Sequence, residues 1–191
     1  TDLYETKKQL LTTHTLIENI MRNLPDMVWA KDLEGQFIAS NKRVEALLGK
    51  SEAEVIGKSD YAFFPHELAT KCRLYDQKVM AEAQTVRNEE WLTFADGHKE
   101  LCETLKSPMV DEKGEIVGVI GIARDITQRR ALEERIRLMQ HCIDQATLGI
   151  FWVNEQGCIV YANQSACHSL GYASEEIMQL MITDIDPIIS P

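Results

Sequence analysis

The stretch that decides the fold is residues 106–127, KSPMVDEKGEIVGVIGIARDIT. Its second half, residues 116–126, is rich in β-branched side chains and predicts a strand. Its first half completes another strand over 99–108, and a turn is expected at 111–114. The stretch ends at Asp125, Ile126 and Thr127, where side chains can cap a helix that follows the strand. We expect this junction to pass strain in the sheet to the helix.

Three further strands are predicted upstream. Residues 89–95 lead through Asp96-Gly97, a common hairpin signal, into the strand at 99–108. Residues 27–31 and 36–40 are short extended runs on either side of a turn. The fold class is therefore α+β, with a five-stranded antiparallel sheet.

Helices are expected on one face of this sheet and at both of its ends. Two short helices are predicted over 41–49 and 51–57, and a longer helix over 66–83. Residues 2–24 form an amphipathic N-terminal helix, because Leu3, Leu10, Ile17 and Leu24 lie seven apart. The helix after the sheet carries Leu132, Ile136, Met139 and Ile143, spaced as in a coiled-coil seam. That helix is either a dimer seam or a surface linker.

The chain repeats itself with an offset of 122 residues. Gly35 returns as Gly157, Asn41 as Asn163, and Gly49 as Gly171. Repetition on this scale indicates two copies of one module. The expected organisation is an N-terminal helix (1–25), a complete domain (26–127), a linker helix (128–147) and the N-terminal part of a second domain (148–191). We expect the chain to be a piece of a longer protein.

These motifs together resemble the PAS domain, including its C-terminal PAC motif. The residues that carry the resemblance are Asp32, Gly35, Asn41, Leu48-Gly49, residues 54–57, Asp96-Gly97 and the stretch 106–127. The resemblance covers residues 20–128 and resumes from about 148. It implies a sensory module of a bacterial signal-transduction protein, either a histidine kinase of a two-component system or a cyclic-di-GMP synthase or phosphodiesterase.

The resemblance also implies which side chains point into the module, since Gly121 faces inward in relatives. Strand alternation then sets the candidate ligand pocket. It comprises Trp29, Lys31, Asn88, Glu90, Cys102, Thr104, Lys106, Val119 and Gly121. The opposite face is apolar, with Trp91, Leu101, Leu105, Ile120 and Ile122, and we expect Leu10 and Ile17 of the first helix to cover it.

The expected pocket places Glu90 between Lys31 and Lys106. One interpretation is an internal ion pair. The other is a small polar or carboxylate-bearing metabolite held by a lysine and Thr104. No cofactor is expected. Asp60 stands where photochemical flavin-binding relatives have a cysteine, which argues against covalent flavin chemistry. Haem stays open as an alternative, since His66 is the one histidine on the long helix. Non-covalent flavin stays open as well, because no motif excludes it.

Composition limits the kinds of partner that we expect the chain to bind. A formal charge of −10 argues against nucleic acid. The five cysteines form no C-x-x-C pair, which fits reduced thiols in the cytoplasm. No apolar run approaches the ~20 residues of a membrane span, so no membrane contact is expected. Zinc or other metal ligation is not indicated.

The residues offer no nucleophile–base set and no phosphate loop, so we expect this segment not to be an enzyme. A kinase or a diguanylate cyclase or phosphodiesterase domain elsewhere in the whole protein stays open. Three hypotheses follow. The segment is a homodimeric sensor of a small molecule that regulates its own C-terminal output domain, a ligand-free dimerisation scaffold, or a redox or gas sensor with haem or flavin.

Overall fold

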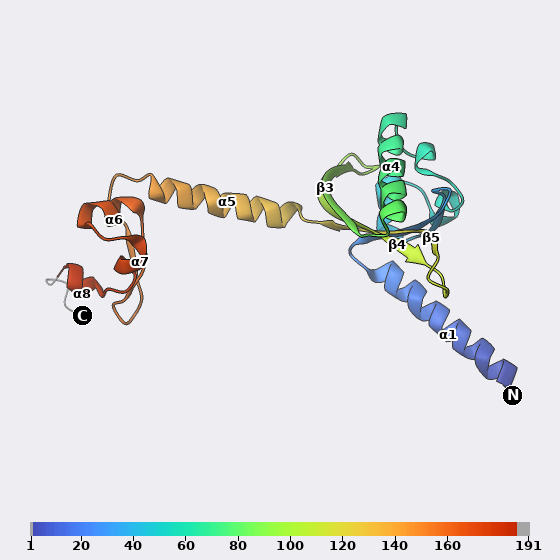
Figure 1. Cartoon of the computed structure of the whole chain (residues 1–191), viewed down its shortest axis with the longest axis horizontal. Coiled ribbons are helices and arrows are strands. Elements are labelled where there is room, and N and C mark those ends of the chain that lie inside the picture. Colours follow the sequence, from blue (N-terminus) through green and yellow to red (C-terminus); the bar gives the residue numbers. More distant parts are fainter. Residues whose placement is uncertain (1, 187–191) are drawn as a thin grey trace. The chain divides into compact units, whose positions relative to one another are not determined.

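The structure, a computed structural model, describes residues 2–186 and divides into two compact units, Thr1–Gln128 and Arg129–Pro191 (Figure 1). Each unit has its own hydrophobic core. The first core includes Met27, Val44 and Phe94, and the second includes Ile159 and Ile177. The last five residues of the expected second domain lie outside the described residues.

The first unit contains the expected five-stranded antiparallel sheet, and its α+β class is confirmed. The strands are β1 (Met27–Asp32), β2 (Phe37–Ser40), β3 (Val86–Thr93), β4 (Lys99–Val110) and β5 (Ile116–Asp125). Their order is β2-β1-β5-β4-β3, so β5 occupies the centre of the sheet. The decisive stretch of sequence thus supplies the strand that pairs with both β1 and β4.

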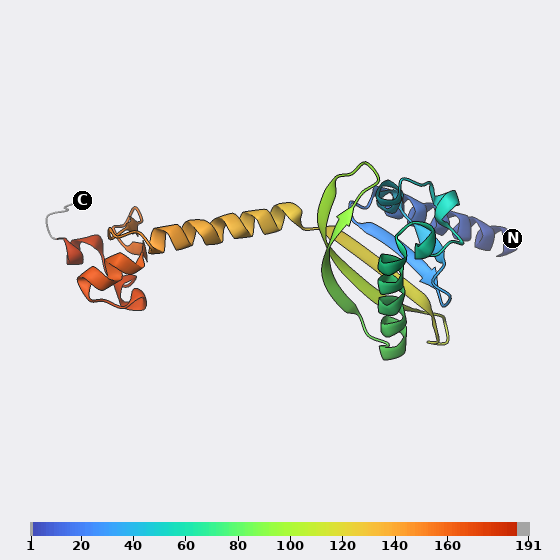
Figure 2. The same ribbon diagram turned by 90° about the horizontal axis from the view of Figure 1, so that it is seen from above.

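Helices on one face of the sheet close this unit (Figures 1 and 2). They are α2 (Lys42–Leu48), α3 (Glu52–Val55), the 3-10 turn η1 (Asp60–Ala62) and α4 (His66–Glu82). Ser51 and Glu54 form the expected capping box of α3, with the backbone N–H of Ser51 donating to Glu54 Oε2 at 3.0 Å. The long helix α4 packs on β4 and β5.

The strands have the register expected from alternation. Gly121 of β5 lies opposite Trp29 of β1 and Lys106 of β4. The inward-facing Cys102, Thr104 and Val119 are buried. A Cβ atom on Gly121 would lie 2.2 Å from Cε2 of Trp29, so only glycine lets the indole pack across the central strand.

The expected cover of the other sheet face is wrong. Helix α1 (Asp2–Asn23) runs away from the sheet (Figure 1), leaving Leu10 71% and Ile17 55% exposed. Trp91 on the outer face is 60% exposed. Only the last turns of α1 approach the sheet, where Ile17 and Met21 line a surface groove with Ile120. A seven-residue stripe shows which side of a helix is apolar, but it does not say what that side packs against.

The second unit contains α5 (Thr127–Asp144, whose first residues belong to the first unit), the hairpin β6 (Phe151–Val153) and β7 (Ile159–Ala162), and three short helices. These helices are α6 (Gln164–Leu170), α7 (Ser174–Ile177) and α8 (Ile182–Ile185). Buried Ile159, Ala166 and Ile177 hold the hairpin and helices together. The unit therefore reproduces the first part of the first unit, from β1 to η1.

One asparagine organises the same junction in both units. Asn41 Oδ1 accepts hydrogen bonds from the N–H groups of Val28 and Val44, and its Nδ2 donates to the carbonyls of Met21 and Asp26. It thereby caps α2 and ties the end of α1 to the start of β1. Asn163 repeats all four bonds in the second unit.

Candidate functional site

The candidate site is a cavity of about 70 Å³ between the sheet and the helices α2 and α4. Apolar and polar side chains both line it. The apolar ones are Met27, Trp29, Phe37, Val44, Leu47, Leu48, Phe64, Leu68 and Leu92. The polar ones are Lys31, Asp60, Cys72, Glu90, Thr104 and Lys106.

A buried network of four charged side chains borders the cavity. Nζ of Lys31 lies 2.5 Å from Oδ2 of Asp60 and 3.1 Å from Oδ2 of Asp76. Nζ of Lys106 lies 2.6 Å from Oδ1 of Asp76. All four residues are buried. Because they come from β1, η1, α4 and β4, the network joins both helical segments to the sheet.

The lysine at the centre of this network is held in its charged form. Burial has the largest single effect on the pKa of Lys31 and lowers it, but Asp76 and Asp60 together outweigh burial, so the pKa is raised from its usual 10.5. Its Nζ also lies 4.7 Å from the centroid of the Phe37 ring. Lys31 is therefore a fixed positive charge at neutral pH rather than a proton donor ready for chemistry.

The expected position of Glu90 between the two lysines is wrong. The lysines pair with Asp60 and Asp76 instead. Glu90 Oε1 accepts hydrogen bonds from Asn88 Nδ2 at 3.1 Å and from Thr104 Oγ1 at 3.3 Å. Within residues 2–186, Glu90 Oε2 accepts no hydrogen bond. Glu90 thus lines the cavity with one carboxylate oxygen uncommitted.

The structure brings five of the nine candidate pocket residues to the cavity, namely Trp29, Lys31, Glu90, Thr104 and Lys106. Asn88 lines a smaller pocket of about 10 Å³ beside it. Cys102, Val119 and Gly121 lie on the same sheet face, but they do not line the cavity. Gly121 acts through packing, because it makes room for the Trp29 ring.

Sequence reasoning missed the two aspartates of the network. Asp76 lies on α4 with buried Ala69 and Val79, spaced seven and three residues away. An acidic residue on the buried stripe of an amphipathic helix requires a cationic partner, and that signal was available in the sequence. Asp60, noted only as a residue in place of a cysteine, is the second partner of Lys31.

The thiols and the histidine near the site are not prepared for chemistry. Burial raises the pKa of the Cys102 thiol to about 12, and burial also raises the pKa of Cys72. His66 is exposed, its ring is tilted by 50° to that of Tyr61, and it is not among the residues that line the cavity. No cluster of three metal-ligating side chains occurs within the described part of the chain.

The junction after β5 is fixed by short hydrogen bonds. Asp125 Oδ1 accepts from the N–H of Thr127 at 2.8 Å and from its Oγ1 at 2.6 Å. Thr127 Oγ1 in turn accepts from the N–H of Leu101 in β4 at 2.8 Å. Ile126 is buried, and its N–H donates to the Leu101 carbonyl. The first residue of α5 is thus bound to the sheet through two strands.

The expected seam residues lie along α5. Leu132, Ile136 and Met139 are exposed, and no residue of α5 is buried. Whether they meet a second chain stays a prediction.

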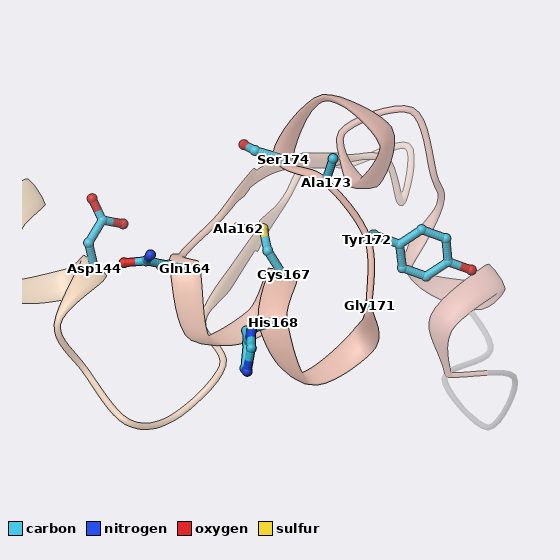
Figure 3. A pocket seen from close by; sticks show the side chains of 9 residues that line it. All are labelled: Asp144, Ala162, Gln164, Cys167, His168, Gly171, Tyr172, Ala173 and Ser174. Carbon is cyan, nitrogen blue, oxygen red and sulfur yellow. The ribbon is translucent and has the colours of Figure 1, made fainter.

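The second unit has an open hollow of about 640 Å³ (Figure 3). Asp144, Gln164, Cys167 and Ser174 are among its lining residues. Their counterparts 122 residues earlier, Arg22, Lys42, Glu45 and Glu52, line the groove beside α1 in the first unit. The hollow therefore corresponds to the outer groove of the first unit and not to its inner cavity.

Comparison with known proteins identifies the class to which this architecture belongs. The PAS fold family matches residues 21–131, and a second PAS fold match covers residues 137–187. The chain belongs to the PAS family and carries two PAS units in tandem. None of the helices within residues 2–186 combines the length and apolar character that crossing a membrane requires.

Two relatives are signalling proteins. The chain is 31% identical over 112 residues to the aerobic respiration control sensor protein ArcB of Escherichia coli, a match that covers 59% of this chain and 14% of ArcB. It is 26% identical over 124 residues to a diguanylate cyclase of Vibrio cholerae, covering 64% of this chain and 39% of that protein. The similarity thus concerns a minor part of each relative.

A solved structure corrects one expectation about partners. The Vibrio cholera VqmA–ligand–DNA complex matches with a TM-score of 0.54 and 26% identity, covering 57% of this chain and 50% of that one. The expectation that the acidic charge of this chain argues against nucleic acid is wrong, because a protein with a similar PAS unit occurs in a complex with DNA.

Proposed function

We propose that residues 26–127 are a sensory module of a multidomain signalling protein and that the inner cavity binds a small molecule. The observation that carries the proposal is the cavity itself, which is lined by both charged and apolar side chains within a unit related to sensor proteins. Binding there would act directly on Lys31, Thr104 and Lys106, which belong to β1 and β4. Both strands pair with β5.

The proposed signal path runs from β5 into α5. Lys106 pairs with Gly121, and β5 continues to Asp125, whose carboxylate caps the first turn of α5 through Thr127. The far end of α5 is bound as well, since Asn163 Nδ2 donates to the carbonyl of Ile143. A shift of β5 would therefore reach the helix that leads into the second PAS unit.

The output is proposed from the relatives. ArcB is a sensor protein, and the second relative is a diguanylate cyclase, which supports a histidine kinase or a cyclic-di-GMP enzyme as the whole protein. The segment itself is a PAS unit with no catalytic role. We propose that it works without haem, since His66 is exposed. A cytoplasmic location stays a prediction.

A second candidate function is a ligand-free scaffold. The observation that favours it is the size of the cavity, because about 70 Å³ is well below the ~300 Å³ and more that is usual for ligand pockets. In that reading the four-residue charge network is a self-contained polar core.

Native mass spectrometry of the whole chain tests the proposal. After incubation with a small-molecule extract of bacterial cells, the wild-type chain should retain an adduct, and Leu68→Trp, which fills the cavity, should lose it. Leu74→Trp, on the same helix but 60% exposed, introduces the same side chain and should retain the adduct. Circular dichroism confirms that both variants are folded. A wild-type chain that acquires no adduct would favour the scaffold.

A further inference from the structure

The charges around the cavity determine what kind of ligand it can accept. Its lining and the network beside it contain two lysines, Lys31 and Lys106, and three carboxylates, Asp60, Asp76 and Glu90. Both lysines are already paired with aspartates at 2.5–3.1 Å. The formal charge of this group is therefore −1, and it lies on Glu90.

Both lysines that line the cavity already contact a carboxylate. Lys71 is exposed and lines the neighbouring pocket, and it is not among the residues that line the cavity. Lys31 contacts Asp60, Asp76 and the Phe37 ring. Lys106 contacts Asp76 and, at 3.5 Å, the carbonyl of Cys72. A carboxylate ligand would have to take a lysine away from a buried aspartate, which leaves that aspartate charged and unpaired in the interior.

Glu90 is placed to receive a hydrogen-bond donor. Its Oε1 is occupied by Asn88 and Thr104, while within residues 2–186 its Oε2 accepts nothing. Glu90 also lines the small neighbouring pocket together with Lys71, Tyr75 and Asn88. Because Leu68, Cys72, Glu90 and Lys106 line both spaces, this neighbouring pocket continues the cavity between α4 and β3. A ligand that comes from this side meets the carboxylate of Glu90.

We propose that the cavity takes a compact, mainly apolar ligand that carries a hydrogen-bond donor and no negative charge. The donor lies on Oε2 of Glu90, and the apolar part lies against Trp29, Leu68 and Leu92. This inference rests on the proposed function and replaces the carboxylate-bearing metabolite that the sequence suggested. The small volume restricts the ligand to a few non-hydrogen atoms.

Three probes of similar size and different charge test the class of ligand. n-Propylammonium, propan-1-ol and propionate are titrated into the whole chain, and ¹H–¹⁵N and methyl ¹H–¹³C spectra report on Leu68, Thr104 and Leu92. We expect the amine and the alcohol to shift these resonances saturably. Propionate should bind at least about tenfold more weakly than the amine, since it lacks a donor and faces unpaired negative charge.

A matched pair of variants locates the interaction. Glu90→Gln should weaken binding of n-propylammonium about tenfold, because a charge-assisted hydrogen bond becomes a neutral one. Glu89→Gln removes the same charge one residue earlier, on the exposed face of β3, and should leave the affinity unchanged.

Two results would overturn the inference. The first would reject only the class of ligand, and the second would also reject the proposed function. If propionate bound as tightly as the amine, or if Glu90→Gln had no effect, the class of ligand would be wrong while the cavity remained a binding site. If none of the three probes shifted the cavity resonances, the cavity would not be a binding site, and the proposed function would fail with the inference.

Discussion

The two PAS units share the residues that build the fold and differ in the residues that surround the cavity. Asn41 and Asn163 make the same four hydrogen bonds, and Gly35 and Gly157 have φ values of 84° and 82°. In contrast, the position of Lys31 is occupied by Val153, and that of Asp60 by Ile182. The β1-to-η1 part of the fold therefore forms without the Lys31–Asp60 pair, which is particular to the first unit.

The largest effect should come from breaking the network at its centre. Asp76→Ala leaves Lys31 and Lys106 with one aspartate between them, an uncompensated buried charge. We expect the free energy of unfolding of the first unit to fall by about 3–5 kcal/mol. Urea denaturation, followed by hydrogen exchange of β4 amides, measures it. Glu67→Ala on the exposed side of α4 is the control. A loss below 1 kcal/mol would show that the network is not desolvated as the structure has it.

The second unit suggests a double substitution that removes half of the network with a smaller loss of stability. Lys31→Val with Asp60→Ile installs the residues that stand at these positions in the second unit and leaves Asp76 paired with Lys106. Apolar replacement of a whole buried pair is often close to neutral, so we expect a loss of less than about 2 kcal/mol. A loss as large as that of Asp76→Ala would mean that the fold of the first unit does depend on these charges.

The shared asparagine allows the same substitution in both units. Asn41→Ala and Asn163→Ala each remove a helix cap and two donors to carbonyl groups, and each should destabilise its own unit by about 2–3 kcal/mol. Site-resolved hydrogen exchange separates the two units in one chain. If only one of the two variants lost stability, the two asparagines would not stabilise their units in the same way. The comparison of the two units would then no longer support the argument about the charge network.

The fold was predictable because its determinants are local. Gly97, Gly114 and Gly121 mark turns and a close approach that the sequence already indicates, and strand alternation gave the correct register. The partners of Lys31 were not found, because Asp60 and Asp76 lie 29 and 45 residues away and meet it only through tertiary packing. The prediction that α1 covers the outer face of the sheet failed for a related reason, since the apolar stripe of a helix does not reveal what the helix packs against.

The pH dependence of the free energy of unfolding should reflect the titration of Lys31. Its pKa is raised in the folded state above the usual 10.5, so its contribution is complete below pH 10.5 and is lost as the pH rises through the folded value. Stability of the wild-type chain should therefore fall more steeply above pH 10.5 than that of the Lys31→Val, Asp60→Ile variant. The difference in slope cannot exceed about 1.4 kcal/mol per pH unit, which is one proton. Urea midpoints at pH 8, 10 and 11 measure it, and equal slopes would contradict the raised pKa.

The smallest effect concerns the point where the first unit passes into α5. Asp125→Ala removes the acceptor of two hydrogen bonds from Thr127 and should weaken the first turn of α5 by about 1 kcal/mol. Amides of the first turn, residues 128–131, should then exchange about fivefold faster, while those of β4 beside the cavity keep their rates. Asp111→Ala, which removes a turn carboxylate at the other end of β5, is the control. Because this cap binds the first residue of α5 to both β4 and β5, faster exchange in α5 with an intact cavity would separate sensing from transmission. If residues 128–131 exchanged at the same rate in Asp125→Ala as in the wild-type chain, the signal would not pass through this cap.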